Sequence, residues 1–314
     1  RNCLVGSEMC IRDRSNRLPI LFLPGDTYAN RMPDPVLQQV EHFSNPGMTA
    51  NDSFKPVTKY FDRITRPEQI LQSLPQAIQT MLDPADCGPA CLSLCQDVQG
   101  ETFEYPEEFF KERVHNIRRP KPDDFQIKQA VERIKNSKNP IIISGGGVFY
   151  SDAMEELSNF AVKHNIPVTQ TVMGYSTMKR DHSHFVGPIG GLGGKAANNL
   201  AKETDLAICI GTKLADFTTG SWANFENPQF KLVSINIARH DANKHLAEAV
   251  IGDAKVSLIE LSNALGDWRS SDSWHKKSQD ELKSWNEYVD KESGPTNQEL
   301  PSYAHAVGAI YRNS

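Results

Sequence analysis

Apolar and polar residues occur in alternating blocks along most of the chain, and from residue 125 onward these blocks follow a regular rhythm. Largely apolar runs such as Pro140–Ile143 and Asp205–Gly211 alternate with segments whose apolar residues recur at helical spacing, such as 127–134. Strands that are apolar on both faces are typical of parallel sheets covered by helices on both sides. The pattern therefore predicts a doubly wound, Rossmann-like α/β domain over residues 125–265. Its remaining strands are expected at 166–169 and 230–236, and its remaining helices around 154–161, 196–201 and 256–265.

Residues 15–106 show the same strand and helix types, separated by longer connections. A buried strand is expected at Leu18–Pro24 and another at Ala90–Cys95. The best helix pattern covers Thr65–Leu82, where Thr65 and Glu68 have the spacing of a capping box. The long polar loop at 25–52 is predicted to hold a short helix around 36–42, and its length favours a functional or interface role.

Composition marks the boundaries between these blocks. Residues 107–124 are charged and rich in proline, as expected of a domain linker. Residues 266–294 are polar, with a spacing that predicts one linker helix, and residues 295–314 would begin a further domain. The opening stretch 1–14 starts with Arg and shows no regular period, so we expect it to be a non-native, adapter-like segment. The whole chain is therefore expected to be an internal fragment.

Charge and composition exclude several classes of partner. The formal net charge is −5, which argues against DNA, RNA or an anionic membrane as a bulk electrostatic partner. No apolar run is long enough for a membrane-spanning helix, and no secretory signal is visible. Six cysteines in 314 residues do not form a disulfide framework, so a reduced, cytoplasmic chain is expected.

Two glycine-rich segments could bind a phosphate. Ser144–Gly147 follows a strand and precedes a helix, where exposed backbone N–H groups suit an anion, although glycine is also what a tight turn needs. Gly191–Ala196 fits the G-x-G-x-x-A spacing, but the stretch 184–189 before it is a poor strand. Five residues are therefore cofactor-binding candidates only if a nucleotide binds: Gly145, Gly146, Gly147, Gly191 and Gly193.

Other reactive side chains give weaker signals. Cys87, Cys91 and Cys95 recur every four residues, but no Cys-x-x-Cys pair or neighbouring histidine accompanies them, so we expect buried small side chains and no metal site. The nine histidines are scattered, and His182 and His184 are expected in a surface loop.

Four segments together closely resemble one enzyme family. They are Pro33–His42, Asn51–Val57, Tyr60–Gln69 and Gln96–Glu101. These segments resemble the trihydroxycyclohexanedione hydrolases of myo-inositol catabolism, thiamine-diphosphate enzymes similar in build to acetolactate synthase. The resemblance runs from about Ser15 to the last residue, and its most specific part is the first hundred residues.

The resemblance implies three domains in the full protein. Residues 15–106 would be the C-terminal part of a pyrimidine-binding domain, 125–265 a cofactor-free central domain, and 295–314 the start of a diphosphate-binding domain. The family's activating Glu would lie before Leu18, so no catalytic residue is expected in this fragment. The family's Gly-Asp-Gly motif is also missing, because no Gly-Asp pair of this sequence is followed by Gly. Thiamine diphosphate and Mg²⁺ are thus expected only in the full-length enzyme, without FAD.

The resemblance also implies the reaction. The family hydrolyses a carbon–carbon bond of a cyclic 1,2-dione to give 5-deoxyglucuronic acid, in a dimer or tetramer whose sites form between subunits. By analogy with acetolactate synthases, Gln38 and Gln39 are expected near the substrate. Two alternatives stay open: an acetolactate-synthase-like carboligase with a flavin in its central domain, and a non-catalytic α/β nucleotide-binding module.

Overall fold

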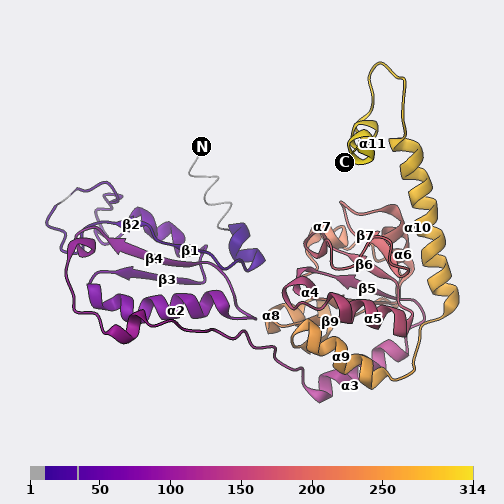
Figure 1. The fold of residues 1–314 in the computed structure, drawn as a ribbon, viewed down its shortest axis with the longest axis horizontal. Coiled ribbons are helices and arrows are strands. Elements are labelled where there is room, and N and C mark those ends of the chain that lie inside the picture. Colours follow the sequence, from indigo (N-terminus) through magenta and orange to yellow (C-terminus); the bar gives the residue numbers. More distant parts are fainter. Residues whose placement is uncertain (1–10, 34, 314) are drawn as a thin grey trace. The chain divides into compact units, whose positions relative to one another are not determined.

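The computed structural model describes residues 11–33 and 35–313, and it divides into two compact units (Figure 1). The first unit ends at Arg118 and the second begins at Arg119. Each unit contains its own parallel β-sheet. Within the described residues, no helix is both long enough and apolar enough to cross a membrane.

The first unit is built on four short parallel strands with β4 in the middle. β1 and β2 pair with one side of β4, and β3 pairs with the other side. Its strands are β1 (Leu21–Phe22), β2 (Gly25–Asp26), β3 (Tyr60–Ile64) and β4 (Ala90–Cys95). Its helical segments are η1 (Ala50–Phe54), η2 (Pro67–Gln69), α2 (Ile70–Leu82), η3 (Val98–Gly100) and η4 (Glu107–Phe110).

The strand expected at Leu18–Pro24 is wrong in extent and burial. Only β1 and β2 are extended there, and the side chains of β1 are half-buried rather than buried. Proline has no N–H to donate to a ladder, and Pro24 contributes only its carbonyl, which accepts from the Leu94 N–H at 2.9 Å. The strand therefore breaks into two pieces at Pro24. The strand expected at Ala90–Cys95 is confirmed as β4.

The predicted helix at 65–82 is confirmed as η2 and α2, but its cap differs from the prediction. The Gln69 side chain, not Glu68, accepts hydrogen bonds from the N–H groups of Thr65 and Arg66. The N-cap is Arg66 and not Thr65, so the N3 position, which supplies the acceptor of a capping box, belongs to Gln69. α2 then packs Ala77 against β4.

One other local prediction for this unit is wrong, and one segment without a clear sequence pattern is helical. Residues 36–42 form turns and an isolated bridge between Gln39 and Thr49, not a helix. Residues 11–16 are helical although the sequence shows no period there, and the Arg14 side chain donates to the Thr58 carbonyl. Residues 1–10 of the opening segment lie outside the described residues.

The second unit contains six parallel strands in the order β10-β9-β8-β5-β6-β7, which is the doubly wound arrangement predicted for residues 125–265. Its strands are β5 (Pro140–Ser144), β6 (Val168–Gln170), β7 (Phe185–Pro188), β8 (Leu206–Ile210), β9 (Lys231–Asn236) and β10 (Glu248–Ile251). Its main helices are α3 (Asp124–Lys135), α5 (Met154–His164), α6 (Lys195–Glu203), α9 (Ala254–Leu265), α10 (Asp272–Ser293) and α11 (Tyr303–Asn313). Its shorter helical segments are α4 (Gly146–Tyr150), η5 (Val172–Gly174), α7 (Asp216–Thr219), α8 (Arg239–Ala242) and η6 (Lys244–Leu246).

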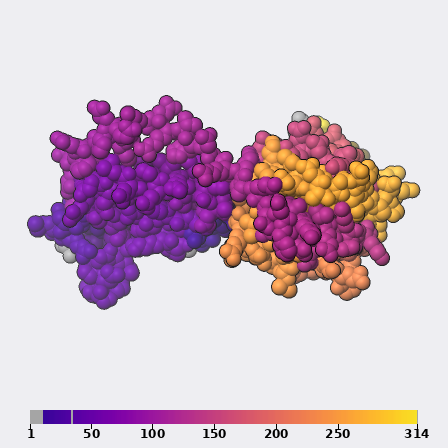
Figure 2. All heavy atoms as spheres, turned by 90° about the horizontal axis from the view of Figure 1, so that it is seen from below, coloured from indigo at the N-terminus to yellow at the C-terminus, as the bar shows by residue number. Residues whose placement is uncertain are grey.

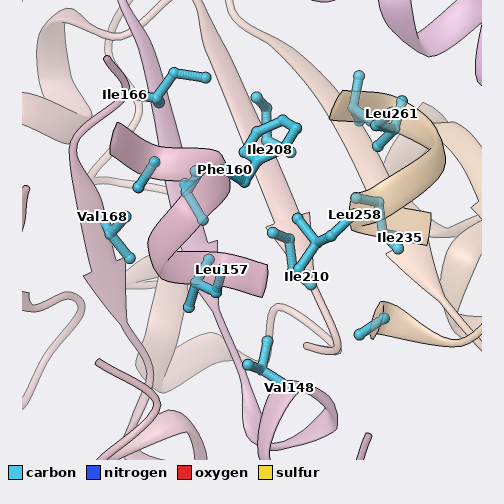
Figure 3. Close-up of a cluster of buried hydrophobic side chains, with 14 of the residues drawn as sticks. Val148, Leu157, Phe160, Ile166, Val168, Ile208, Ile210, Ile235, Leu258 and Leu261 are labelled. Carbon is cyan, nitrogen blue, oxygen red and sulfur yellow. The ribbon is translucent and has the colours of Figure 1, made fainter. Parts of the chain in front are cut away.

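Both faces of this sheet are covered, which explains its continuously apolar strands. On one face α3, α5 and α9 pack apolar side chains such as Phe160 and Leu258 onto Ile142, Ile208 and neighbouring residues (Figure 3). Figure 2 shows this side in space-filling form, with orange side chains of α9 next to magenta ones of α3. On the other face α6 packs over Ile141, Ile143 and the adjacent strands.

The linker helix expected at 266–294 is observed as α10, and its first half packs on the second unit. Trp274 is buried in the same apolar cluster as α6, and its indole N–H donates to the Pro140 carbonyl at 2.9 Å. α11 folds back against α10 (Figure 1), where the buried Gly308 allows Ser293 to approach closely.

Not all histidines lie on the surface as predicted. His164 is fully buried, and its Nδ1–H donates to the Trp268 carbonyl at 2.7 Å. His184, at the start of β7, is also buried and stacks on His275 of α10 with ring centroids 4.2 Å apart. Burial, then the neighbouring His275, His182 and Arg269, lowers the pKa of His184 to about 4. Neutral imidazoles thus help to hold α10 on the sheet.

We expect the stability of the chain to fall as the pH drops from 6.5 towards 4. In this window the unfolded state takes up a proton at His184 that the folded state, with its lowered pKa, does not bind. A shift of this size corresponds to a few kcal/mol. Urea unfolding at about pH 7 and at about pH 4.5, near the lower end of this window, should show a smaller loss of stability for His184→Gln. Between these two pH values, the exposed His42→Gln control should lose as much unfolding free energy as the unsubstituted chain. Equal losses of unfolding free energy in all three proteins would contradict the prediction.

Candidate functional site

A buried ion-pair network lies where β2, β3 and β4 end in the first unit. The Arg63 Nε lies 2.7 Å from an Asp26 carboxylate oxygen, and its Nη2 lies 3.0 Å from Asp52. The Ser93 hydroxyl donates to the same Asp26 oxygen. Because the carboxyl ends of parallel strands meet at one edge of a sheet, three strands bring these side chains together.

Burial acts against the Asp26 charge, and the network compensates for it. Burial raises the pKa of Asp26, but hydrogen bonds from Ser93 and Arg63 and from the Thr27 N–H outweigh this effect and lower the pKa below its usual value. Burial likewise raises the pKa of Asp52, and its partners Lys55, Thr49 and Arg63 lower it overall. Both carboxylates are therefore charged at neutral pH.

The network fixes the long loop that precedes it. Arg63 also donates to the Thr49 hydroxyl at 3.0 Å, and the Asn51 amide donates to the Gly25 carbonyl at 2.7 Å. Thr49 in turn pairs with Gln39, and the Ala50 N–H donates to the Gln38 carbonyl. The buried ion pairs thus hold both ends of this segment against the sheet.

An open groove of about 550 Å³ borders this edge of the sheet. Gln38 lines it, together with Gln96 and Gln99, which follow β4. Gln39 does not line it, because its side-chain oxygen accepts from the Val36 N–H at 2.7 Å within the loop. The full lining is Gly25, Tyr28, Pro33, Val36, Leu37, Gln38, Gln96 and Gln99. Among the described residues, the groove is thus bordered by side-chain amides, Tyr28 and apolar groups.

The sequence signals missed most of this site. Asp26, Arg63 and Ser93 were not candidates, because each reads as an ordinary strand or turn residue. The available signal was a charged residue at or near the end of a short strand. Asp26 follows Gly25 at the end of β2, and Arg63 lies within β3, one residue before its end. Gln96 was quoted only as part of a family resemblance.

The cysteines behave as expected for small buried side chains. Cys91 and Cys95 lie buried in β4, and Cys87 is half-buried. Burial, followed by the charges of Asp26 and Asp97, raises the pKa of the Cys95 thiol to about 11. Within the described residues, no group of three His, Cys, Asp or Glu side chains is arranged to hold a metal ion.

Ser144–Gly147, the first glycine-rich segment, lies at the point where the strand order of the second sheet reverses. β5 and β8 flank this switch point, and ligands of doubly wound folds commonly bind there. The Gly145 N–H donates to the Ile210 carbonyl at 2.8 Å, and the Gly147 N–H donates to Gly211 at 2.9 Å. A Cβ on Gly147 would lie 2.5 Å from the Gly211 Cα. These glycines serve close backbone packing.

The second glycine segment has a better strand context than predicted. The stretch 185–188 forms β7, so Gly191–Gly194 does connect a strand to the start of α6. Its N–H groups nevertheless turn inward: Gly191 donates to Phe217, and Gly193 donates to Gly190. The donors that a phosphate would use are therefore engaged by carbonyl oxygens.

Comparisons with known proteins find similarity over most of the chain. Residues 127–261 match the family described as "Thiamine pyrophosphate enzyme, central domain". The chain is 46% identical over 272 residues (87% of this chain, 43% of the relative) to the 3D-(3,5/4)-trihydroxycyclohexane-1,2-dione hydrolase of Clostridium perfringens strain 13. It is 48% identical to the Clostridium tetani protein of that name over 251 residues, which are 80% of this chain and 39% of the relative. It is 46% identical to the 3D-(3,5/4)-trihydroxycyclohexane-1,2-dione hydrolase 1 of Bacillus cereus over 259 residues, which are 82% of this chain and 40% of the relative. The chain thus spans about two fifths of the length of these relatives.

Replacing Asp26 by Asn should destabilise the chain by about 2 kcal/mol at pH 7, because Arg63 loses its buried counter-charge. The Asp26 pKa is lowered on folding, so its contribution is complete above pH 3.8 and is lost as the pH falls through the folded-state value. Urea unfolding should therefore show a smaller difference at pH 3. The exposed Asp86→Asn variant serves as control and should change stability by less than about 0.5 kcal/mol. A pH-independent difference for Asp26→Asn would contradict this account.

Gly147→Ala should destabilise the chain by about 2 kcal/mol, because the added methyl group overlaps the Gly211 backbone. Gly191→Ala is the matched control, since the nearest atoms to its added Cβ are at ordinary contact distance, 3.8 Å or more. Thermal unfolding compares the two variants directly. Equal melting temperatures would show that the Gly147–Gly211 approach does not constrain the turn.

Proposed function

We propose that this chain is part of a thiamine pyrophosphate enzyme, a hydrolase that cleaves a carbon–carbon bond of a trihydroxycyclohexane-1,2-dione. The observation that carries the proposal is 46% identity to proteins of that name over 87% of the chain. The product would be 5-deoxyglucuronic acid, in inositol catabolism. The longer protein would act in the cytoplasm as a dimer or tetramer.

The described residues do not form a complete thiamine-diphosphate site. Among the described residues that line the groove in the first unit, none has a carboxylate that could bond an aminopyrimidine ring. Asp26 and Asp52 at the same edge are engaged by Arg63, and Asp97 after β4 accepts from the Ala29 and Asn30 N–H groups. We therefore assign the cofactor and Mg²⁺ to the longer protein and derive no step through them from this chain.

The proposed contribution of this chain is to shape the substrate side of the site. Of the two glutamines considered, Gln38 lines the groove and is proposed to face the substrate. Gln39 is proposed to act near the site by holding the loop, since its side chain bonds Val36. Side-chain amides can both donate to and accept from the hydroxyl and carbonyl groups of a polyhydroxylated dione.

The two alternative functions make different use of the second unit. A flavin-dependent carboligase or a nucleotide-binding module would need free donors at Gly145, Gly146 and Gly147 or at Gly191 and Gly193. The N–H groups of Gly145, Gly147, Gly191 and Gly193 already bond carbonyl oxygens. This supports a central domain without FAD or another nucleotide.

The full-length protein tests the proposed activity. With thiamine diphosphate and Mg²⁺ it should convert the dione to 5-deoxyglucuronic acid, and chromatography measures this conversion. The purified protein should show no flavin absorbance. Gln38→Ala should lower kcat/KM by about tenfold through one lost polar contact, whereas Gln72→Ala on the exposed side of α2 should not. Acetolactate formation from pyruvate, or bound flavin, would favour the carboligase instead.

The 314-residue chain alone should neither turn over the dione nor bind thiamine diphosphate with Mg²⁺ at micromolar affinity. Titration calorimetry measures the cofactor, and equilibrium dialysis with NAD, FAD and ADP measures nucleotide binding by the same chain. Micromolar, Mg²⁺-dependent heat would overturn the assignment of the cofactor to other segments. Tight nucleotide binding would overturn the cofactor-free central domain.

A further inference from the structure

A single guanidinium bonds both ends of the segment 27–48, which we call the groove loop. The Arg63 Nε donates to Asp26 at 2.7 Å, just before this segment begins. The Arg63 Nη2 donates to the Thr49 hydroxyl and to Asp52, each at 3.0 Å, just after the segment returns to the sheet. One side chain of β3 therefore closes the base of the groove loop.

The groove loop has little regular structure of its own. Its described residues form turns, bends and the single bridge at Gln39, with no helix or strand. Its place therefore depends on the contacts at its ends. Several of its residues line the groove, namely Tyr28, Pro33, Val36, Leu37 and Gln38. A change at the base of the loop is thus expected to reach the groove.

Two backbone contacts connect the base of the loop to Gln38. The Ala50 N–H donates to the Gln38 carbonyl at 2.9 Å. Beside this bond, Gln39 pairs with Thr49 in an isolated antiparallel bridge. Thr49 is also the residue whose hydroxyl accepts from Arg63. A shift of Thr49 would therefore move the backbone of Gln38 with it.

These contacts are largely buried, and all of them lie within the first unit. The Asp26 side chain is fully buried, and the Arg63 side chain is 22% exposed. The Asn51 amide adds a second anchor, since it donates to the Gly25 carbonyl at 2.7 Å and to the Ser93 hydroxyl at 2.8 Å. The ends of the groove loop are thus fixed by side chains of their own unit.

Stability alone does not explain why charged groups occupy this position. Replacing a buried ion pair by well-packed apolar side chains is often neutral or stabilising. A guanidinium differs in that it presents its N–H donors in one rigid plane, whereas a lysine ammonium is a point charge on a flexible stem. Arg63 uses this plane to bond acceptors at both ends of the groove loop, which fixes their relative placement.

We propose that Arg63 is a positioning residue for substrate binding: it bonds the base of the groove loop and thereby sets the place of Gln38 in the groove. The inference rests on the proposed function, in which Gln38 faces the dione. Groups that contact a substrate must be held to within about 0.5 Å of their productive place by the side chains behind them. Arg63 acts through the loop and is not itself among the residues that line the groove.

Hydrogen exchange in the 314-residue chain tests this placement without substrate. In Arg63→Lys the Ala50 amide, which donates to the Gln38 carbonyl, should exchange at least about tenfold faster, because lysine cannot bond both ends of the loop. The amides of α2 should keep their protection, which establishes that the variant is folded. Arg66→Lys is the matched control, since Arg66 is exposed in the same unit, and it should leave exchange at Ala50 unchanged.

Kinetics of the full-length protein test the effect on the substrate. Arg63→Lys should raise KM for the dione about tenfold and change kcat by less than about twofold, because the lost contact is made in the ground state and the transition state alike. Added to Gln38→Ala, it should lower kcat/KM by less than about twofold more, since the side chain that it places is already gone. Two independent effects would instead multiply to about 100-fold.

Unchanged exchange at Ala50 in Arg63→Lys overturns the proposal, and so do losses of kcat/KM that multiply in the double variant. If Arg63→Lys does not fold, Thr49→Val removes the hydroxyl acceptor alone, and its exchange at Ala50 and its KM must then rise. A full-length protein that leaves the dione unchanged overturns the proposed function instead. The exchange result then decides by itself whether Arg63 places Gln38.

Discussion

The requirement that a parallel sheet be covered on both faces governs the structure of the second unit. Its strands are apolar on both sides, so helices must pack over each face, and α3, α5 and α9 on one side and α6 and α10 on the other meet that requirement. The loops gather at the two edges where strands end, and ligands of such folds commonly bind at the carboxyl edge. The chemistry of this unit is decided at its carboxyl edge.

The two units use their carboxyl edges in opposite ways. In the first unit, Arg63 and its carboxylate partners bring charge into the edge, and the hydrogen bonds around them hold the loop that carries Gln38 beside a groove. In the second unit, glycine N–H groups bond neighbouring carbonyls, so the edge offers few donors and presents apolar side chains outward. A groove bordered by side-chain amides suits a small polyhydroxylated molecule.

Most of the fold was predictable because periodicity reports burial directly. The strands at 140–144 and 206–210 and the helix at 70–82 have patterns that only one type of element satisfies. The candidate site was predicted less well. Gln38 came from a family resemblance, and Arg63 and Asp26 had no signal because their partners are distant in sequence. Whether Gln38 faces the substrate stays a prediction.

The sequence by itself determined the α/β class and the order of the main strands and helices, and it carried the resemblance to one enzyme family. The physical reason is that these depend on local periodicity and on residue identity. Only the tertiary structure decided that Pro24 splits a strand, that Gln69 rather than Glu68 caps a helix, and that His184 is buried against His275. Each of these depends on which groups meet across the fold, because a hydrogen bond or a stacked ring needs a partner that sequence spacing does not place.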